Sequence, residues 1–130
     1  MDELVRWLGV QLDEDERIAR VAANELEGLE LGSEWRYDGR SVETVRERTM
    51  VAVGSQDFME PGVGGHVAEH DPARVLREID AKRELLRQYE HLKYEVMPDD
   101  LTGVWAFEAV LRAHALVYAG RPGYRDEWRP

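Results

Sequence analysis

The chain has 130 residues, of which 27 are acidic and 17 are lysine or arginine, so its formal net charge is -10. It contains no cysteine, which excludes disulfides, thiolate metal ligands and a cysteine nucleophile. Because phosphate contacts require a basic patch, the acidic balance argues against direct binding of nucleic acid.

Residues 2 to about 29 carry apolar side chains at three- and four-residue spacing, which predicts an amphipathic helix. The acidic run from Asp13 to Glu16 interrupts the apolar stripe, and Asp13 with Glu16 resembles a capping box. One kinked helix and two short helices both fit this pattern. Residues 1–30 hold nine acidic residues and three arginines, so this segment carries a charge of -6. A solvated helix face is the simplest role for these acids.

Residues 33–55 have the character of a small antiparallel sheet. Asp38-Gly39 is a strong hairpin signal after residues 35–37, and residues 41–46 and 49–53 are rich in β-branched side chains. We therefore expect two or three strands. The competing prediction is a helix over residues 42–50 with Ser41 as its cap.

Residues 56–65 contain Pro61 and three glycines, and this composition predicts a flexible surface loop. Two helices follow. The first begins at Asp71-Pro72, with Asp71 as the N-cap and Pro72 in the first turn, and runs to about Tyr94. The second runs from about Leu101 to Ala119, with Gly120 after it.

These elements predict an α+β, mostly helical fold, in which three main helices pack around a short two- or three-stranded antiparallel sheet. The length fits a single domain over residues 1–130. There is neither a signal-peptide pattern nor an apolar run long enough to span a bilayer. We therefore expect a cytoplasmic protein that does not contact membranes.

His66, Glu69 and His70 follow the order H-x-x-E-H, which one class of zinc peptidases uses. In such a site the histidines bind zinc and the glutamate is the general base. Asp71 and Pro72 should end any helical face directly after His70, so the two histidines are expected on a separate, shorter turn. We therefore favour a structural role for them, with a metal site as the alternative.

The residues 121–130 form a tail in which aromatic and arginine side chains alternate at four-residue spacing. On a helical turn the aromatics would form one face and the arginines another. Such residues are enriched at binding hot spots, but the simpler prediction, which we favour, is that the aromatics dock the tail onto the chain's own core. The candidate partner-binding residues are Arg121, Tyr124, Arg125, Trp128 and Arg129.

Four stretches of the sequence carry a family resemblance: MDELVRWL, VAVGSQDFMEP, HVAEHDPARVLREIDAKRELL and YAGRPGYRDEWRP. They resemble an uncharacterised family of small actinobacterial proteins that also occurs in phages and mobile elements, the domain of unknown function 6221. The resemblance implies no reaction, substrate or cofactor. In that family the two histidines are typical but a glutamate at the position of Glu69 is not, which weighs against peptidase chemistry.

The leading hypothesis is a non-catalytic binding or regulatory protein that acts on an unidentified protein partner and needs no cofactor. The first alternative is a metal-binding protein or zinc-dependent hydrolase built on residues 66–70. The second is a DNA mimic, in which the acidic first helix occupies the groove of a DNA-binding protein. A homodimer is also possible, since Trp7 or Trp105 could lie at a subunit interface as readily as in a core.

Overall fold

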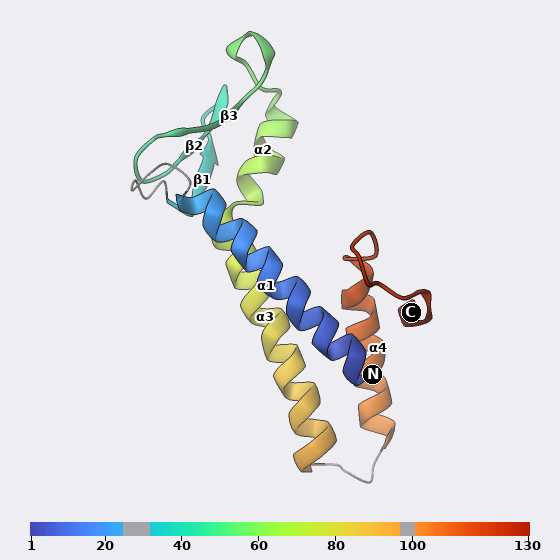
Figure 1. The fold of residues 1–130 in the computed structure, drawn as a ribbon. Coiled ribbons are helices and arrows are strands. Elements are labelled where there is room, and N and C mark those ends of the chain that lie inside the picture. Colours follow the sequence, from blue (N-terminus) through green and yellow to red (C-terminus); the bar gives the residue numbers. More distant parts are fainter. Residues whose placement is uncertain (25–31, 97–100) are drawn as a thin grey trace. The chain divides into compact units, whose positions relative to one another are not determined.

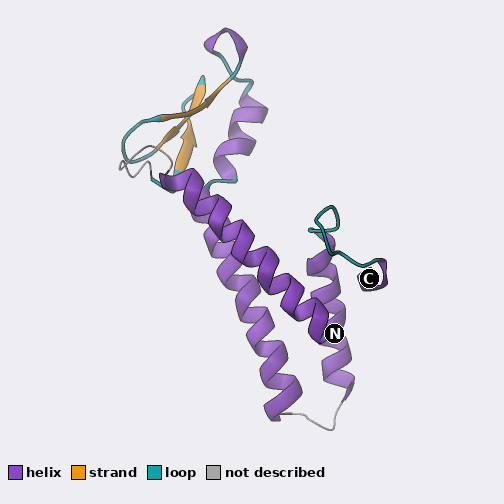
Figure 2. Ribbon diagram, viewed as in Figure 1, coloured by secondary structure: helices purple, strands orange, loops and turns teal. Residues whose placement is uncertain are grey.

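A computed structural model describes residues 1–24, 32–96 and 101–130. Within these ranges the chain forms four α-helices and one three-stranded antiparallel sheet (Figure 1), so the predicted α+β, mostly helical class is confirmed. Helices dominate the described residues, as Figure 2 shows. The elements are α1 (Asp2–Asn24), β1 (Trp35–Tyr37), β2 (Ser41–Thr44), β3 (Met50–Val53), α2 (Pro61–Glu69), α3 (Pro72–His91) and α4 (Leu101–Leu116).

The chain divides into two compact units. Residues Met1–Glu14 and Asp80–Pro130 make one, which we call the helical unit, and Asp15–Ile79 make the other, the sheet unit. Both α1 and α3 contribute residues to each unit. The prediction of a single domain stays a prediction.

In the sheet unit the strands follow one another in the order β1-β2-β3, with Trp35 paired to Thr44 and Tyr37 to Val42. The hairpin turns at Asp38-Gly39, where Gly39 has a φ of 96° that other residues rarely adopt. The Asp38 carboxylate accepts the backbone N–H groups of Arg40 and Ser41 at 2.9 and 2.8 Å. The predicted strands are confirmed, and the competing helix over residues 42–50 is wrong.

The glycine-rich segment before the histidines is a helix, so the predicted loop over residues 56–65 is wrong in its second half. Pro61 occupies the start of α2, where its missing N–H costs nothing. Gly64 is buried against β1, and a Cβ at this position would lie 2.3 Å from Cδ2 of Tyr37. The glycine therefore allows α2 to approach the sheet closely. From composition alone, the same glycines predicted a flexible loop.

The boundary between α2 and α3 falls where the sequence predicts it. His70 ends α2, and Asp71 accepts the backbone N–H of Arg74 at 2.8 Å as the N-cap of α3. Pro72 is the first residue of that helix. Beyond His91, α3 continues as a π-helical turn over Leu92–Val96, close to its predicted end.

In the helical unit the buried side chains come from α1, α3, α4 and the tail: Leu4, Leu8, Leu12, Tyr89, Val104, Leu111, Ala115, Tyr118 and Trp128. The helix α1 passes through Asp13 to Glu16 without a break, so the two-helix alternative is wrong. Its predicted residues 25–29 lie outside the described ranges. The helix α4 ends at Leu116 instead of Ala119, because the amides of Tyr118 and Ala119 bond to carbonyls three residues back, at 2.9 and 3.1 Å.

Candidate functional site

The aromatic residues of the C-terminal tail surround Trp7, within the helical unit. The Trp7 ring centroid lies 5.3 Å from that of Trp128 and 5.7 Å from that of Tyr124. The indole N–H of Trp7 also donates to the Pro122 carbonyl at 3.0 Å. Only 6% of the Trp128 surface is exposed. The two predicted partner-binding aromatics therefore contact the chain's own first helix.

The tail arginines do not form the predicted helical ladder, because residues 121–125 are not helical and only a single 3-10 turn follows, over Asp126–Trp128. Arg121 lies 4.8 Å from the Tyr118 ring centroid and donates to the Gln11 carbonyl. Arg125 pairs with Glu3 at 2.5 Å, and Arg129 with Asp126 at 3.2 Å. A partner-binding role for these residues stays a prediction. The shared helical face that motivated this prediction does not form.

The H-x-x-E-H residues lie at the end of α2. The rings of His66 and His70 have centroids 4.3 Å apart, and His70 Nδ1 lies 2.8 Å from the His66 carbonyl oxygen. Glu69 is exposed and pairs with Arg74 at 3.7 Å. A catalytic zinc takes three protein ligands, and the described residues hold no group of three or more histidine, aspartate or glutamate side chains that could bind a metal ion. The two histidines therefore form a pair at the end of α2, with His66 on the helix and His70 as its C-cap.

The acidic side chains of α1 are largely engaged in ion pairs. Asp13 contacts Arg83 at 2.7 Å, and Glu16 contacts Arg20 at 2.7 Å. Lys93 contacts Asp2 at 2.8 Å, and this bond and that from Tyr94 lower the pKa of the Asp2 carboxyl. Since a DNA mimic needs free carboxylates in phosphate-like positions, these pairs remove much of the charge on which that hypothesis depends.

The exposed face of α4 is almost entirely apolar. Nine residues from Leu101 to Val117 are exposed, and Thr102 has the only polar side chain among them. Trp105 exposes 62% of its surface, and Val117, directly after the helix, exposes 70%. The other members of this set, which we call the α4 face, are Leu101, Ala106, Ala109, Val110, Ala113 and Leu116.

The opposite side of α4 is also apolar, since Val104, Leu111 and Ala115 lie in the core of the helical unit. A helix that is apolar all round is typical of a position buried on every side. The exposed residues that α3 contributes to the same unit are polar or charged, apart from Ala81. In this unit, α4 therefore carries an exposed apolar face that α3 lacks.

Two charged residues border the α4 face. Glu108 accepts the hydroxyl of Tyr89 at 3.1 Å, and burial raises the pKa of that tyrosine. Arg112 donates to the Glu127 carbonyl at 3.4 Å, which joins α4 to the tail. Both side chains are half-buried. The apolar stripe consequently has a charged edge on one flank, as many protein interfaces have.

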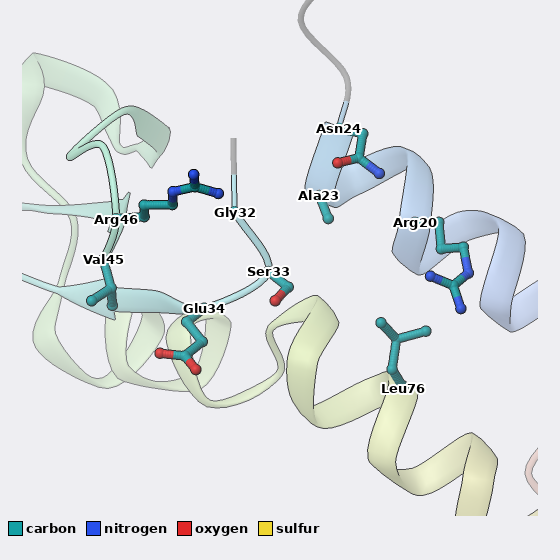
Figure 3. A pocket seen from close by; sticks show the side chains of 9 residues that line it. All are labelled: Arg20, Ala23, Asn24, Gly32, Ser33, Glu34, Val45, Arg46 and Leu76. Carbon is teal, nitrogen blue, oxygen red and sulfur yellow. The ribbon is translucent and has the colours of Figure 1, made fainter. Parts of the chain in front are cut away.

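The sheet unit contains a hollow of about 460 Å³ (Figure 3), lined by Arg20, Ala23, Asn24, Gly32, Ser33, Glu34, Val45, Arg46 and Leu76. The described chain stops at Asn24 and resumes at Gly32, both on the rim of this hollow.

Sequence reasoning singled out Trp105 as a residue that a dimer could bury, but it missed the remaining members of the α4 face. The sequence nevertheless contained a signal for this apolar face. Apolar residues occupy both the buried and the exposed positions of the helical repeat between Leu101 and Val117, whereas an ordinary surface helix is apolar on one side alone.

No helix in the described part of the chain is both long and apolar enough to cross a membrane. Among known protein families, the model of DUF6221, a family of unknown function, matches residues 1–130. Neither the curated proteins nor the solved structures gave a match to the chain.

Proposed function

The chain belongs to the DUF6221 family, whose function is unknown, and we propose a function for it from the geometry of α4. The protein binds another protein through the α4 face and acts as a non-catalytic binding or regulatory protein. The observation that carries this proposal is the 62% exposure of Trp105 within an apolar helix face. Tryptophan is among the residues most enriched at binding hot spots.

The size of the α4 face supports this proposal. From the exposed fractions of its five large apolar residues, with the other four residues counted as exposed, the face offers on the order of 700 Å², whereas the largest apolar patch of a typical monomer is about 300–600 Å². Apolar surface of this extent is unfavourable in water, at roughly 25 cal/mol per Å². A partner that covers it would recover that free energy.

The tail has a supporting role in this proposal. Trp128 and Tyr124 pack on Trp7, and Arg112 joins α4 to the tail. These contacts hold α4 against the rest of the helical unit, while the apolar side of the helix stays available. The actinobacterial or phage setting belongs to the proposal as well, and it rests on the sequence resemblance alone.

Photo-crosslinking in the cells in which the protein occurs naturally tests the proposal directly. A benzoylphenylalanine residue replaces Trp105 in one variant and Val10 in a second, matched control. Val10 is 61% exposed on α1, so the two probes are equally accessible. We expect a protein adduct that depends on the probe at position 105 and is absent with the probe at position 10. Equal adducts from both positions, or none from position 105, would contradict the proposal.

A further inference from the structure

We propose that the occupant of the α4 face is a second copy of this chain, bound so that the two α4 helices lie antiparallel and cross near Ala109. This inference rests on the proposed function and names the partner. A two-fold interface brings one patch of a protein against the same patch on its copy, so the patch must complement itself. The sequence of α4 meets that requirement.

The arrangement of large and small side chains is self-complementary about Ala109. At 3.6 residues per turn, Ala109 lies near the middle of the α4 face, and the exposed residues extend about equally to both sides of it. In an antiparallel pair centred there, Trp105 of one copy faces Ala113 of the second. Leu101 and Val117 lie at the outer edges of the face and flank this central contact. The alanines at the centre allow the two helices to approach closely, and the bulk of Trp105 fills the space that Ala113 leaves.

The available area and charge also fit a second copy. The roughly 700 Å² of the α4 face is close to the about 800 Å² that each partner contributes to an interface of standard size. Two copies of a chain with a net charge of -10 repel one another over most of their surface. The α4 face carries no formal charge, so copies that meet there avoid placing like charges in direct contact.

The charged edge of the face favours the antiparallel orientation. Glu108 and Arg112 lie on one flank of α4, one turn apart. A two-fold rotation that reverses the helix keeps this flank on the same side of the pair. It therefore places Arg112 of one copy beside Glu108 of the second, on that flank near the middle of the contact. Opposite charges at a rim mainly select the orientation and contribute little to affinity.

Cysteine crosslinking tests this geometry, because the natural chain has no cysteine. In the antiparallel pair, Ala109→Cys brings the two thiols together at the two-fold axis, within the Cα separation of about 7 Å that a disulfide tolerates. Val117→Cys places its two thiols at opposite ends, about 24 Å apart along the helices. We expect rapid oxidation of Ala109→Cys to a disulfide-linked dimer, and no disulfide between the two copies of Val117→Cys. Efficient crosslinking of both variants would indicate parallel helices and overturn the proposal.

Sedimentation equilibrium measures the association itself. The wild-type chain is expected at twice its monomer mass of 15.0 kDa. Trp105→Glu should raise the dissociation constant by about tenfold or more, as the loss of a central tryptophan does at other interfaces. Val10→Glu introduces the same charge at an equally exposed helical position outside the α4 face and should leave the constant unchanged. Circular dichroism of both variants checks that they are folded.

The outcomes separate this inference from the proposed function. A monomeric wild-type chain, together with no disulfide in Ala109→Cys, overturns the dimer. If the probe at position 105 then captures a different protein, the proposed function stands without it. If that probe captures no protein and the wild-type chain, unlike Trp105→Glu, binds neutral lipid vesicles, both proposals fail. An adduct of twice the chain mass from position 105 supports both.

Discussion

The Asp71 carboxylate joins two elements of the sheet unit, because one of its oxygens accepts the backbone N–H of Trp35 at 3.1 Å while the other caps α3. A cap alone was expected from the sequence. The second bond ties the first residue of β1 to the start of α3, and both amides lose their acceptor if the carboxylate is removed.

We predict that Asp71→Ala lowers the free energy of unfolding by about 2 kcal/mol, which combines a lost helix cap with an unsatisfied strand amide. Urea denaturation followed by circular dichroism measures this change. Asp80→Ala makes the same substitution at an exposed position of α3 and should stay within about 0.5 kcal/mol of the wild type. Equal effects of the two substitutions would show that the Asp71 contacts do not contribute.

Gly64 and Gly65 give a second, opposed pair of predictions. A Cβ at Gly64 meets the ring of Tyr37, whose hydroxyl is held by the Met59 carbonyl at 2.7 Å, so the ring cannot move freely. Gly64→Ala should therefore destabilise the fold by about 1–3 kcal/mol. Gly65 has no such neighbour within 4 Å among the described residues, and Gly65→Ala should stabilise α2 by about 0.5–1 kcal/mol. Thermal melts of both variants decide this, and two shifts of the same sign would contradict the packing of α2 on β1.

Residues around Trp7 give a third prediction. Trp128→Ala removes a buried ring from the helical unit and should cost about 3 kcal/mol. Limited proteolysis with trypsin should then cleave the tail after Arg125 sooner than in the wild type. The matched control is Tyr124→Phe, because the hydroxyl of Tyr124 is buried without a hydrogen-bond partner among the described residues. Its loss should be neutral or slightly stabilising. Cleavage at the wild-type rate in Trp128→Ala would mean that the tail is not held through this ring.

The contrast between α2 and α3 shows which helix starts can be predicted from sequence patterns. The start of α3 was predictable because Asp71 and Pro72 act locally, through one carboxylate and one fixed φ angle. The start of α2 was not, because glycine lowers helix propensity and only a distant residue, Tyr37, explains why Gly64 is there. Local rules cannot anticipate a contact between residues 27 positions apart, so a helix with three glycines was predicted as a loop.

One part of the candidate site could likewise be predicted from the sequence, and the other part could not. The buried stripe of α4 follows helical spacing, so it could be predicted from the sequence: Val104, Leu111 and Tyr118 are buried and Phe107 is half-buried. Which of the remaining apolar residues are covered depends on the tail, and the tail docks on Trp7 and leaves the α4 face open. The aromatic and arginine residues of the tail suggested a partner surface because their spacing was regular. Their actual contacts come from turns, which spacing does not predict.

The last prediction concerns pH. Burial, and to a lesser extent the charge of Lys82, lower the pKa of His114 below its ordinary value. The unfolded chain therefore binds a proton at this histidine at a higher pH than the native chain does. As the pH falls below about 6.5, the unfolded state gains protons first and the free energy of unfolding decreases. The contribution of neutral His114 is complete above that pH and is lost as the pH falls through the lowered pKa. His114→Gln cannot be protonated, so its stability should fall less than that of the wild type between pH 7.5 and pH 5. Urea unfolding of both proteins across this range measures the difference, and parallel pH profiles would show that His114 is solvated in the native state.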